Sequence, residues 1–141
     1  DAVRSIADGH IILSRDLAAK NHYPAIDVLQ SVSRVMPKVV TKEQQIVASH
    51  LRDLMAAYAD AEDLINVGAY VAGSNLKVDK AIAVHDSLDA LLKQDIEEAA
   101  TIDELYDKMV EIARIAEQSV NPNFLKEENE RTNNSYNFNK V

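Results

Sequence analysis

Residues that interrupt helices are scarce in this chain, which has three glycines and three prolines among its 141 residues. Glycine and proline are the strongest local breakers of regular structure, so few positions can end a helix. Aromatic residues make up 5% of the chain and tryptophan is absent, so a core must consist mainly of Leu, Ile, Val, Ala and Met side chains. The sequence therefore predicts a mainly α chain, with long helices joined by short connections.

The most regular helical pattern begins at Thr41-Lys-Glu-Gln44, a capping box whose side chains can satisfy free backbone N–H groups at a helix start. Apolar residues then recur at spacings of three to four as far as Gly68, which predicts a long amphipathic helix. The expected buried face of this helix consists of Val47, Leu51, Leu54, Met55, Tyr58, Leu64 and Ile65.

Two more helices are expected after this one. Gly73-Ser74-Asn75 is the clearest turn signal in the chain and separates the long helix from the second helix. A further capping box, Thr101-Ile-Asp-Glu104, begins the third. The expected buried residues are Ile82, Leu88, Leu91, Leu92 and Ile96 in the second helix, and Leu105, Met109, Ile112 and Ala116 in the third.

The N-terminal region shows a strand pattern and not a helical one. Residues 10–13, His-Ile-Ile-Leu, form a short apolar run after Gly9, which predicts one buried β-strand. A lone strand needs sheet neighbours, and no second convincing strand is visible in the sequence. We therefore expect its partners in polypeptide that precedes Asp1, and we interpret the chain as a fragment.

Short helical and irregular segments follow this strand. Ser14 is a suitable N-cap for a short helix over residues 15–20, which Pro24 cannot continue. Residues 22–40 contain two prolines and no sustained period, which predicts a structured loop with at most one helical turn. At the other end of the chain, Asn, Glu and Lys dominate from Asn121 onward, so residues 119–141 are expected to form a flexible polar tail.

Composition excludes several kinds of function. Cysteine is absent, which excludes disulfides and thiol nucleophiles. A net charge of -8 and a pI near 4.9 argue against nucleic-acid binding, because neutralising phosphates needs clustered Lys and Arg. No apolar run approaches the roughly 18 to 20 residues that span a bilayer, and no signal-peptide pattern is present. A soluble protein without a transmembrane segment is expected.

Motifs for independent catalysis are also missing. No Gly-x-x-x-x-Gly-Lys-Ser/Thr phosphate loop is present, so the chain by itself is not expected to cradle or hydrolyse a triphosphate. The four histidines, His10, His22, His50 and His85, lie in separate segments without metal-ligand spacing, so no metal site is expected. We interpret His85 as a partly buried helix residue.

The irregular segment from His22 to Met36 is harder to explain as simple structure. It contains an aromatic residue beside a proline and a single arginine, and functional residues often lie on loops that a rigid scaffold presents. Composition alone still favours Tyr23 as core filler and Arg34 as a surface charge.

Longer motifs resemble a known family. Residues 9–15, 22–27 and 31–36 are similar to the end of the catalytic core in flagellar and type III secretion ATPases, relatives of the F-type ATP synthase β subunit. Residues 60–75 resemble the C-terminal helical domain of that family, and its flagellar branch in particular. The similarity covers about residues 1–118.

This resemblance implies a fold and a domain division. The fold is the C-terminal three-helix domain of an F1/RecA-like ATPase, with one residual core strand and a loop at its N-terminal end. Residues 1–40 would be the remnant of the catalytic core and residues 41–118 the helical domain, with residues 119–141 as the tail. The parent protein would hydrolyse ATP with Mg as a homohexameric ring and so power protein export.

The resemblance also implies roles for single residues. Tyr23 corresponds to the aromatic residue that stacks on the adenine of its own subunit's nucleotide, and a π-face on a proline-stiffened loop suits that task. Arg34 corresponds to an arginine finger that reaches the nucleotide of the neighbouring subunit. Ile96 and Ile102 would lie near the adenine, although the β subunit has aromatic residues there.

The turn between the first two long helices corresponds to a loop that contacts a coiled-coil stalk protein passing through the ring. Its candidate contact residues are Gly73, Ser74, Asn75, Lys77 and Lys80. The corresponding β-subunit loop is acidic and this one is not, so a plain interhelical turn remains an equal interpretation. Other implied partners are a regulator, export-gate proteins, export substrates and chaperones, at the cytoplasmic side of the membrane export apparatus.

Three alternatives remain open from the sequence. The chain can be an autonomous helical adaptor whose acidic surface docks a basic partner, and an unpaired strand would argue against that role. It can be a non-catalytic regulatory subunit of the same superfamily. It can also belong to the virulence-secretion branch instead of the flagellar one. The isolated segment is expected to be monomeric, inactive and without a bound cofactor.

Overall fold

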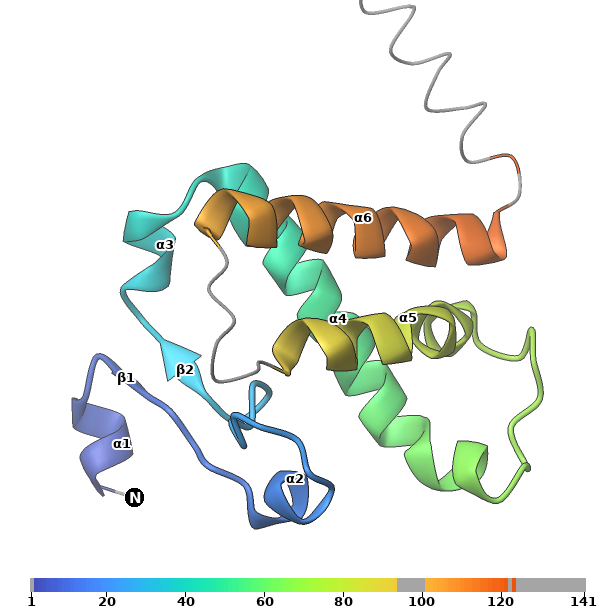
Figure 1. The fold of residues 1–141 in the computed structure, drawn as a ribbon, viewed down its shortest axis with the longest axis horizontal. Coiled ribbons are helices and arrows are strands. Elements are labelled where there is room, and N and C mark those ends of the chain that lie inside the picture. Colours follow the sequence, from blue (N-terminus) through green and yellow to red (C-terminus); the bar gives the residue numbers. More distant parts are fainter. Residues whose placement is uncertain (1, 94–100, 122, 124–141) are drawn as a thin grey trace, which may run out of the picture.

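The computed structural model describes residues 2–93, 101–121 and 123. Three long helices, α4 (Lys42–Asn66), α5 (Leu76–Leu92) and α6 (Ile102–Val120), pack on one another. A smaller N-terminal layer of short elements lies beside them (Figure 1). In chain order that layer comprises α1 (Ala2–Ile6), β1 (Gly9–His10), α2 (Arg15–Ala19), β2 (Val32–Ser33) and α3 (Met36–Val39).

Each long helix begins at the side-chain cap that its sequence supplies. Thr41 and Gln44 form the predicted capping box of α4, and Thr101 and Glu104 form that of α6. Asn75 caps α5, because its side chain accepts hydrogen bonds from the backbone N–H groups of Lys77 and Val78. The three helices, the two predicted capping boxes and the predicted turn before α5 are thus confirmed.

The core lies where α4, α5 and α6 meet. Its buried residues are Leu51, Leu54, Ala81, Val84, Leu88, Ile112 and Ala116, with Val47, Met55, Tyr58, Leu91 and Met109 packed against them. Aliphatic and alanine side chains dominate this cluster, as the low aromatic content predicted.

Three residues expected on buried faces of the long helices are exposed instead, and one of them is Leu105 of α6, with 38% of its surface exposed. The buried positions of α5 are Val78, Ala81, Val84 and Leu88, and Ile82 lies one position off this stripe with 38% of its surface exposed. Leu64 is likewise 53% exposed, because the buried face of α4 runs through Leu54 and Ala61 and Leu64 lies outside it. Ile96 lies outside the described residues.

The prediction of one unpaired strand was wrong. β1 pairs with β2 as an antiparallel two-stranded sheet, with Gly9 opposite Ser33, and Leu13 forms an isolated bridge with Ile26. A Cβ on Gly9 would lie 2.6 Å from the Val32 carbonyl oxygen, so glycine is needed for this approach. The apolar side chains of Ile11 and Leu13, expected to be buried, are exposed.

Of the remaining N-terminal elements, α2 and α3 agree with expectation, whereas α1 was not predicted. The Ser14 hydroxyl accepts a hydrogen bond from the backbone N–H of Leu17 and so caps α2. In the loop of residues 22–40, α3 is the one helical turn among the described residues. Its first residues include Pro37, which suits a helix start.

Candidate functional site

The loop between α2 and β2 carries Tyr23 on its outer side. The Tyr23 side chain is 53% exposed, so it is not core filler. Its neighbour His22 is 5% exposed and is the one buried polar residue in the described part of the chain. The loop therefore turns one ring toward solvent and the next toward the helices.

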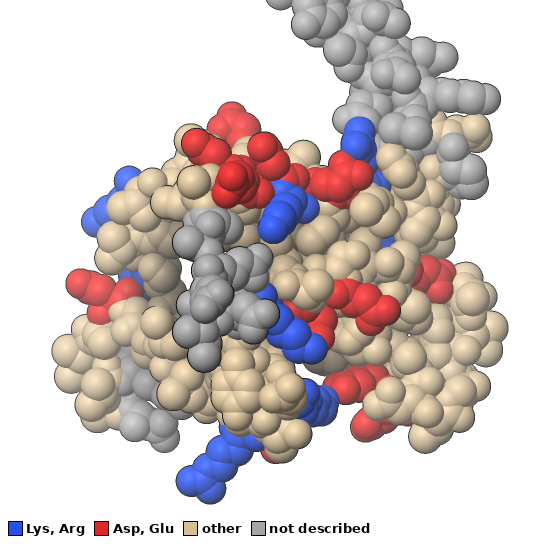
Figure 2. All heavy atoms as spheres, viewed as in Figure 1, with Lys and Arg blue, Asp and Glu red and all other residues tan. Residues whose placement is uncertain are grey.

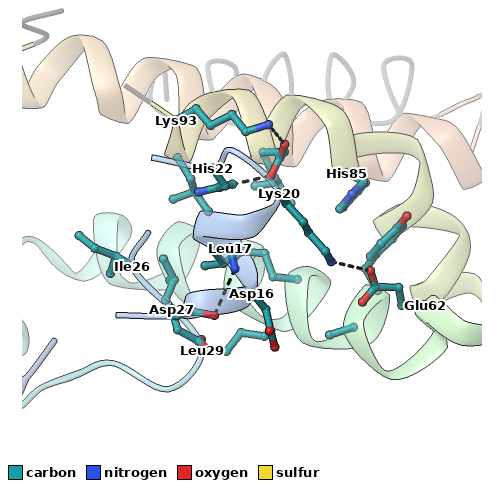
Figure 3. Close-up of a pocket in the computed structure, with 18 residues that line it drawn as sticks. Asp16, Leu17, Lys20, His22, Ile26, Asp27, Leu29, Glu62, His85 and Lys93 are labelled. Carbon is teal, nitrogen blue, oxygen red and sulfur yellow. Dashed lines mark hydrogen bonds and ion pairs between the residues drawn. The ribbon is translucent and has the colours of Figure 1, made fainter. Parts of the chain in front are cut away.

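His22 anchors this loop to α5. Its Nε2 lies 3.2 Å from Oδ1 of Asp89, and its Nδ1 lies 3.3 Å from the carbonyl oxygen of Pro24. Lys93, at the end of α5, contacts the other oxygen of Asp89 at 2.6 Å. Figure 3 shows His22 and Lys93 both pointing toward this carboxylate.

The surroundings of Asp89 favour its charged form. Burial raises the pKa of the Asp89 carboxyl, but the hydrogen bond and charge of Lys93 and the charges of His22 and His85 together lower it below its ordinary value. Asp89 is therefore a carboxylate near neutral pH.

Arg34 lies directly after β2 and is exposed. Its backbone N–H donates to the carbonyl oxygen of Asp8 at 2.8 Å, which fixes the start of the side chain. Its guanidinium makes one long contact, from Nη2 to the Ser5 carbonyl oxygen at 3.5 Å. The backbone is held while most of the guanidinium remains available.

Arg52 holds the segment that precedes Arg34. From α4, its Nη2 donates to the carbonyl oxygens of Leu29 at 3.0 Å and Ser31 at 2.8 Å. A single guanidinium thus binds two backbone carbonyl groups of the loop to α4. Neither the His22 contact nor the Arg52 contact was predicted, because each joins residues far apart in the sequence.

A cavity of about 410 Å³ lies between the α2 segment, α4 and α5. The rings of Tyr58 and His85 stack within it, with centroids 3.6 Å apart. The bridge from Lys20 to Glu62, 3.3 Å long, crosses between α2 and α4 (Figure 3). His85 is half-buried, as predicted, and no group of three or more His, Cys, Asp or Glu side chains among the described residues could hold a metal ion.

Of the two isoleucines predicted near the nucleotide, the structure describes Ile102 alone. Ile102 is the first residue of α6 and is 76% exposed. Ile96 lies outside the described residues. The predicted place of both isoleucines near the adenine stays a prediction.

The predicted contact residues between α4 and α5 form a capped turn. Gly73 has φ of +84°, which favours glycine, and Ser74 and Asn75 are occupied by backbone hydrogen bonds. Lys77 is exposed. Lys80 differs, because its Nζ donates to both carboxylate oxygens of Glu117 on α6 at 2.8 Å.

Exposed apolar side chains surround this turn, and sequence reasoning missed them. Val67, Val71 and Leu76 are each more than half exposed. The sequence gives one sign of this exposure, because these residues lie near Gly68 and Gly73 and outside the apolar periodic positions of the two helices. We call Val67, Val71, Leu76 and Lys77 the tip surface.

The charge of the molecule is uneven. Figure 2 shows acidic side chains gathered along α6. This helix carries the acidic residues Asp103, Glu104, Asp107, Glu111 and Glu117 against the basic residues Lys108 and Arg114. Within residues 2–93, 101–121 and 123, none of the helices is both long and apolar enough to cross a membrane.

Two family models match consecutive parts of this chain, and together they define the class as the C-terminal part of an ATPase subunit of the ATP synthase type. Residues 1–33 match the ATP synthase alpha/beta family, nucleotide-binding domain. Residues 40–111 match the T3SS EscN ATPase C-terminal domain. The chain belongs to this family of type III secretion ATPase C-terminal domains, which confirms the resemblance and the predicted fold.

Individual relatives and solved structures support this family membership. A flagellum-specific ATP synthase of Treponema pallidum (strain Nichols) is 51% identical over 98 residues, which cover 70% of this chain and 22% of that protein. The assembled ATPase EscN of the enteropathogenic E. coli type III secretion system superposes with a TM-score of 0.75 at 38% identity, over 79% of this chain and 27% of EscN. EscN in complex with its central stalk EscO gives the same TM-score and identity, over 80% and 28%. The chain thus spans about a quarter of the length of these relatives.

Proposed function

We propose that this chain is the C-terminal part of a flagellar or type III protein-export ATPase, whose hydrolysis of ATP powers the export of substrate proteins. The observation that carries the proposal is a loop anchored at both ends that presents exposed Tyr23 and Arg34 from a member of this family. Residues 1–40 complete the catalytic core, residues 41–118 form the helical domain and residues 119–141 are the tail.

Tyr23 binds the adenine of the nucleotide held by its own subunit. Its exposed ring lies beside Pro24 on a loop anchored by buried His22, so its π-face is available for stacking. The phosphate groups and Mg are bound by polypeptide outside this sequence, because the sequence contains no phosphate loop.

Arg34 acts on the nucleotide of the neighbouring subunit. Its backbone is fixed by Asp8 and its guanidinium makes one long contact, which leaves its donors free for a phosphoryl group. Such a finger requires a ring, and EscN is described as an assembled ATPase. We propose a homohexamer for the parent protein.

The tip surface contacts a coiled-coil stalk protein. EscN is described in complex with its central stalk EscO, and exposed Val67, Val71 and Leu76 offer the apolar contacts that a coiled coil can bury. Gly73, Ser74 and Asn75 shape the turn, and Lys77 supplies a charge. Lys80 serves mainly to join α5 to α6 through Glu117.

We assign the remaining partners on the family alone. They are a regulator, export-gate proteins, export substrates and chaperones, and the site of action is the cytoplasmic, membrane-peripheral side of the export apparatus. The acidic surface of α6 makes nucleic acid an unsuitable partner.

Replacing Arg34 tests this function. In the full-length ATPase that contains this segment, Arg34→Ala should lower the rate of ATP hydrolysis on the order of 10³- to 10⁵-fold, because charge on the transferring phosphoryl group loses its stabilising contact. ATP binding should remain near wild type. Arg15→Ala, an exposed arginine of the same segment, is the matched control. Normal turnover by Arg34→Ala would refute the assignment.

A further inference from the structure

The buried side chain of His22 joins the loop that carries Tyr23 to Asp89 of α5. The imidazole is 5% exposed, and both of its nitrogens are engaged, one by Asp89 and one by the carbonyl oxygen of Pro24. His22 and Pro24 flank Tyr23 in the loop, whereas Asp89 lies on α5. The imidazole therefore ties the backbone on both sides of Tyr23 to a helix.

The contact on α5 is preorganised. Lys93 lies one helical turn after Asp89 and contacts its Oδ2 at 2.6 Å, while the other carboxylate oxygen, Oδ1, contacts His22. The charges of Lys93, His22 and His85 keep Asp89 ionised despite the effect of burial. A fixed carboxylate is a stronger acceptor than a neutral side chain.

Beside this buried contact, the loop segment and the long helices leave a cavity between them. The cavity of about 410 Å³ separates the segment from Ser14 to Leu29 from the facing sides of α4 and α5. The bridges across it are polar, and the Lys20 to Glu62 bridge is largely exposed, which makes it weak. The position of the Tyr23 backbone relative to α5 therefore depends mainly on His22.

We propose that His22 is a positioning residue, which sets the adenine-stacking geometry of Tyr23 and makes ATP affinity depend on the position of α5. This inference rests on the proposed nucleotide role of Tyr23. α5 begins at the tip surface, and Asp89 lies about 20 Å along it from Leu76. A partner that shifts the tip thus has a direct structural connection to the nucleotide loop.

The test compares variants of the full-length ATPase by ATP dissociation constant and by kcat. His22→Phe keeps a buried ring but removes both nitrogen contacts. It should raise the ATP dissociation constant about 3- to 10-fold, a part of the roughly tenfold or larger loss expected when Tyr23→Ala removes base stacking altogether. kcat should change little, because Arg34 is held by separate contacts to Asp8 and through Arg52.

Two further variants separate positioning from general stability. Asp89→Ala should reproduce the loss of ATP affinity. The double variant, His22→Phe with Asp89→Ala, should bind ATP no more weakly than either single variant, because both substitutions remove the same contact. His22→Gln keeps an N–H donor near the position of Nε2 and should recover most of the affinity. Lys20→Gln breaks the neighbouring bridge to Glu62 and should bind ATP like wild type.

Several outcomes would overturn the inference. They are wild-type affinity in both His22→Phe and Asp89→Ala, additive losses in the double variant, or an equal loss in Lys20→Gln. Circular dichroism shows whether each variant protein is folded. If His22→Phe does not fold, the ATP affinity of Asp89→Ala decides whether the inference holds. If Tyr23→Ala also binds ATP normally, the proposed role of Tyr23 fails as well. If only Tyr23→Ala is impaired, His22 alone was misassigned.

Discussion

Asp89 joins two segments that the sequence separates by more than sixty residues, since it contacts His22 in the N-terminal loop and Lys93 at the end of α5. Burial alone raises the pKa of its carboxyl, whereas Lys93 and then His22 and His85 lower it, and the net pKa is below the ordinary value. A lowered pKa in the folded state means that folding favours the ionised carboxylate. The carboxylate therefore stabilises the fold.

This stabilisation should depend on pH in a defined direction. It is fully present above the ordinary aspartate pKa of about 3.9 and is lost as the pH falls through the lower folded-state pKa. Asp89→Asn should reduce the free energy of unfolding at neutral pH, and the difference from wild type should shrink as the pH falls below about 4. Urea unfolding of both proteins across this range measures it. A difference that is constant with pH would contradict the assignment.

Single residues differ in how far the sequence reveals them. Tyr23 and Arg34 stand in motifs from which the family resemblance predicts their roles, and both are exposed in the structure. His22 and Arg52 carry no such signal, because their importance comes from contacts with residues on distant elements. Such contacts exist only after the helices have packed.

At the scale of elements, the helix starts were predictable because each is encoded within a few residues. Thr41 with Gln44 and Thr101 with Glu104 form the expected caps, and Asn75 of the expected turn caps α5. The β1–β2 pair was not, because a two-residue strand is too short to show alternation. The exposure of Ile82 was missed because helix periodicity alone leaves the exact stripe undetermined.

The cap of α5 gives a quantitative test at this scale. Asn75→Ala removes the acceptor for the backbone N–H groups of Lys77 and Val78, so it should destabilise the fold by about 1 kcal/mol. Asn66→Ala, at the exposed end of α4, is the control and should change stability little. Thermal unfolding followed by circular dichroism compares the two. Equal stabilities would show that the Asn75 side chain does not support the helix.

At the scale of the whole molecule, the internal pairing of β1 with β2 removes the unpaired strand as evidence against an autonomous adaptor. Family membership argues against that alternative instead. Exposed apolar residues of the N-terminal layer, including Ile11, Leu13 and Val32, support packing against the rest of a catalytic core. On the proposed function, the chain contributes side chains to nucleotide sites whose phosphate-binding parts lie in other polypeptide.

Mixed rings test directly whether Arg34 serves the neighbouring subunit. One inactive full-length variant carries Arg34→Ala, and the other carries an intact Arg34 with a disabled phosphate loop. If Arg34 acts across the subunit interface, mixing the two should restore ATP hydrolysis, because an intact phosphate loop then meets an intact arginine from next door. Mixed rings that assemble but stay as inactive as either parent would contradict a role in the adjacent subunit's site.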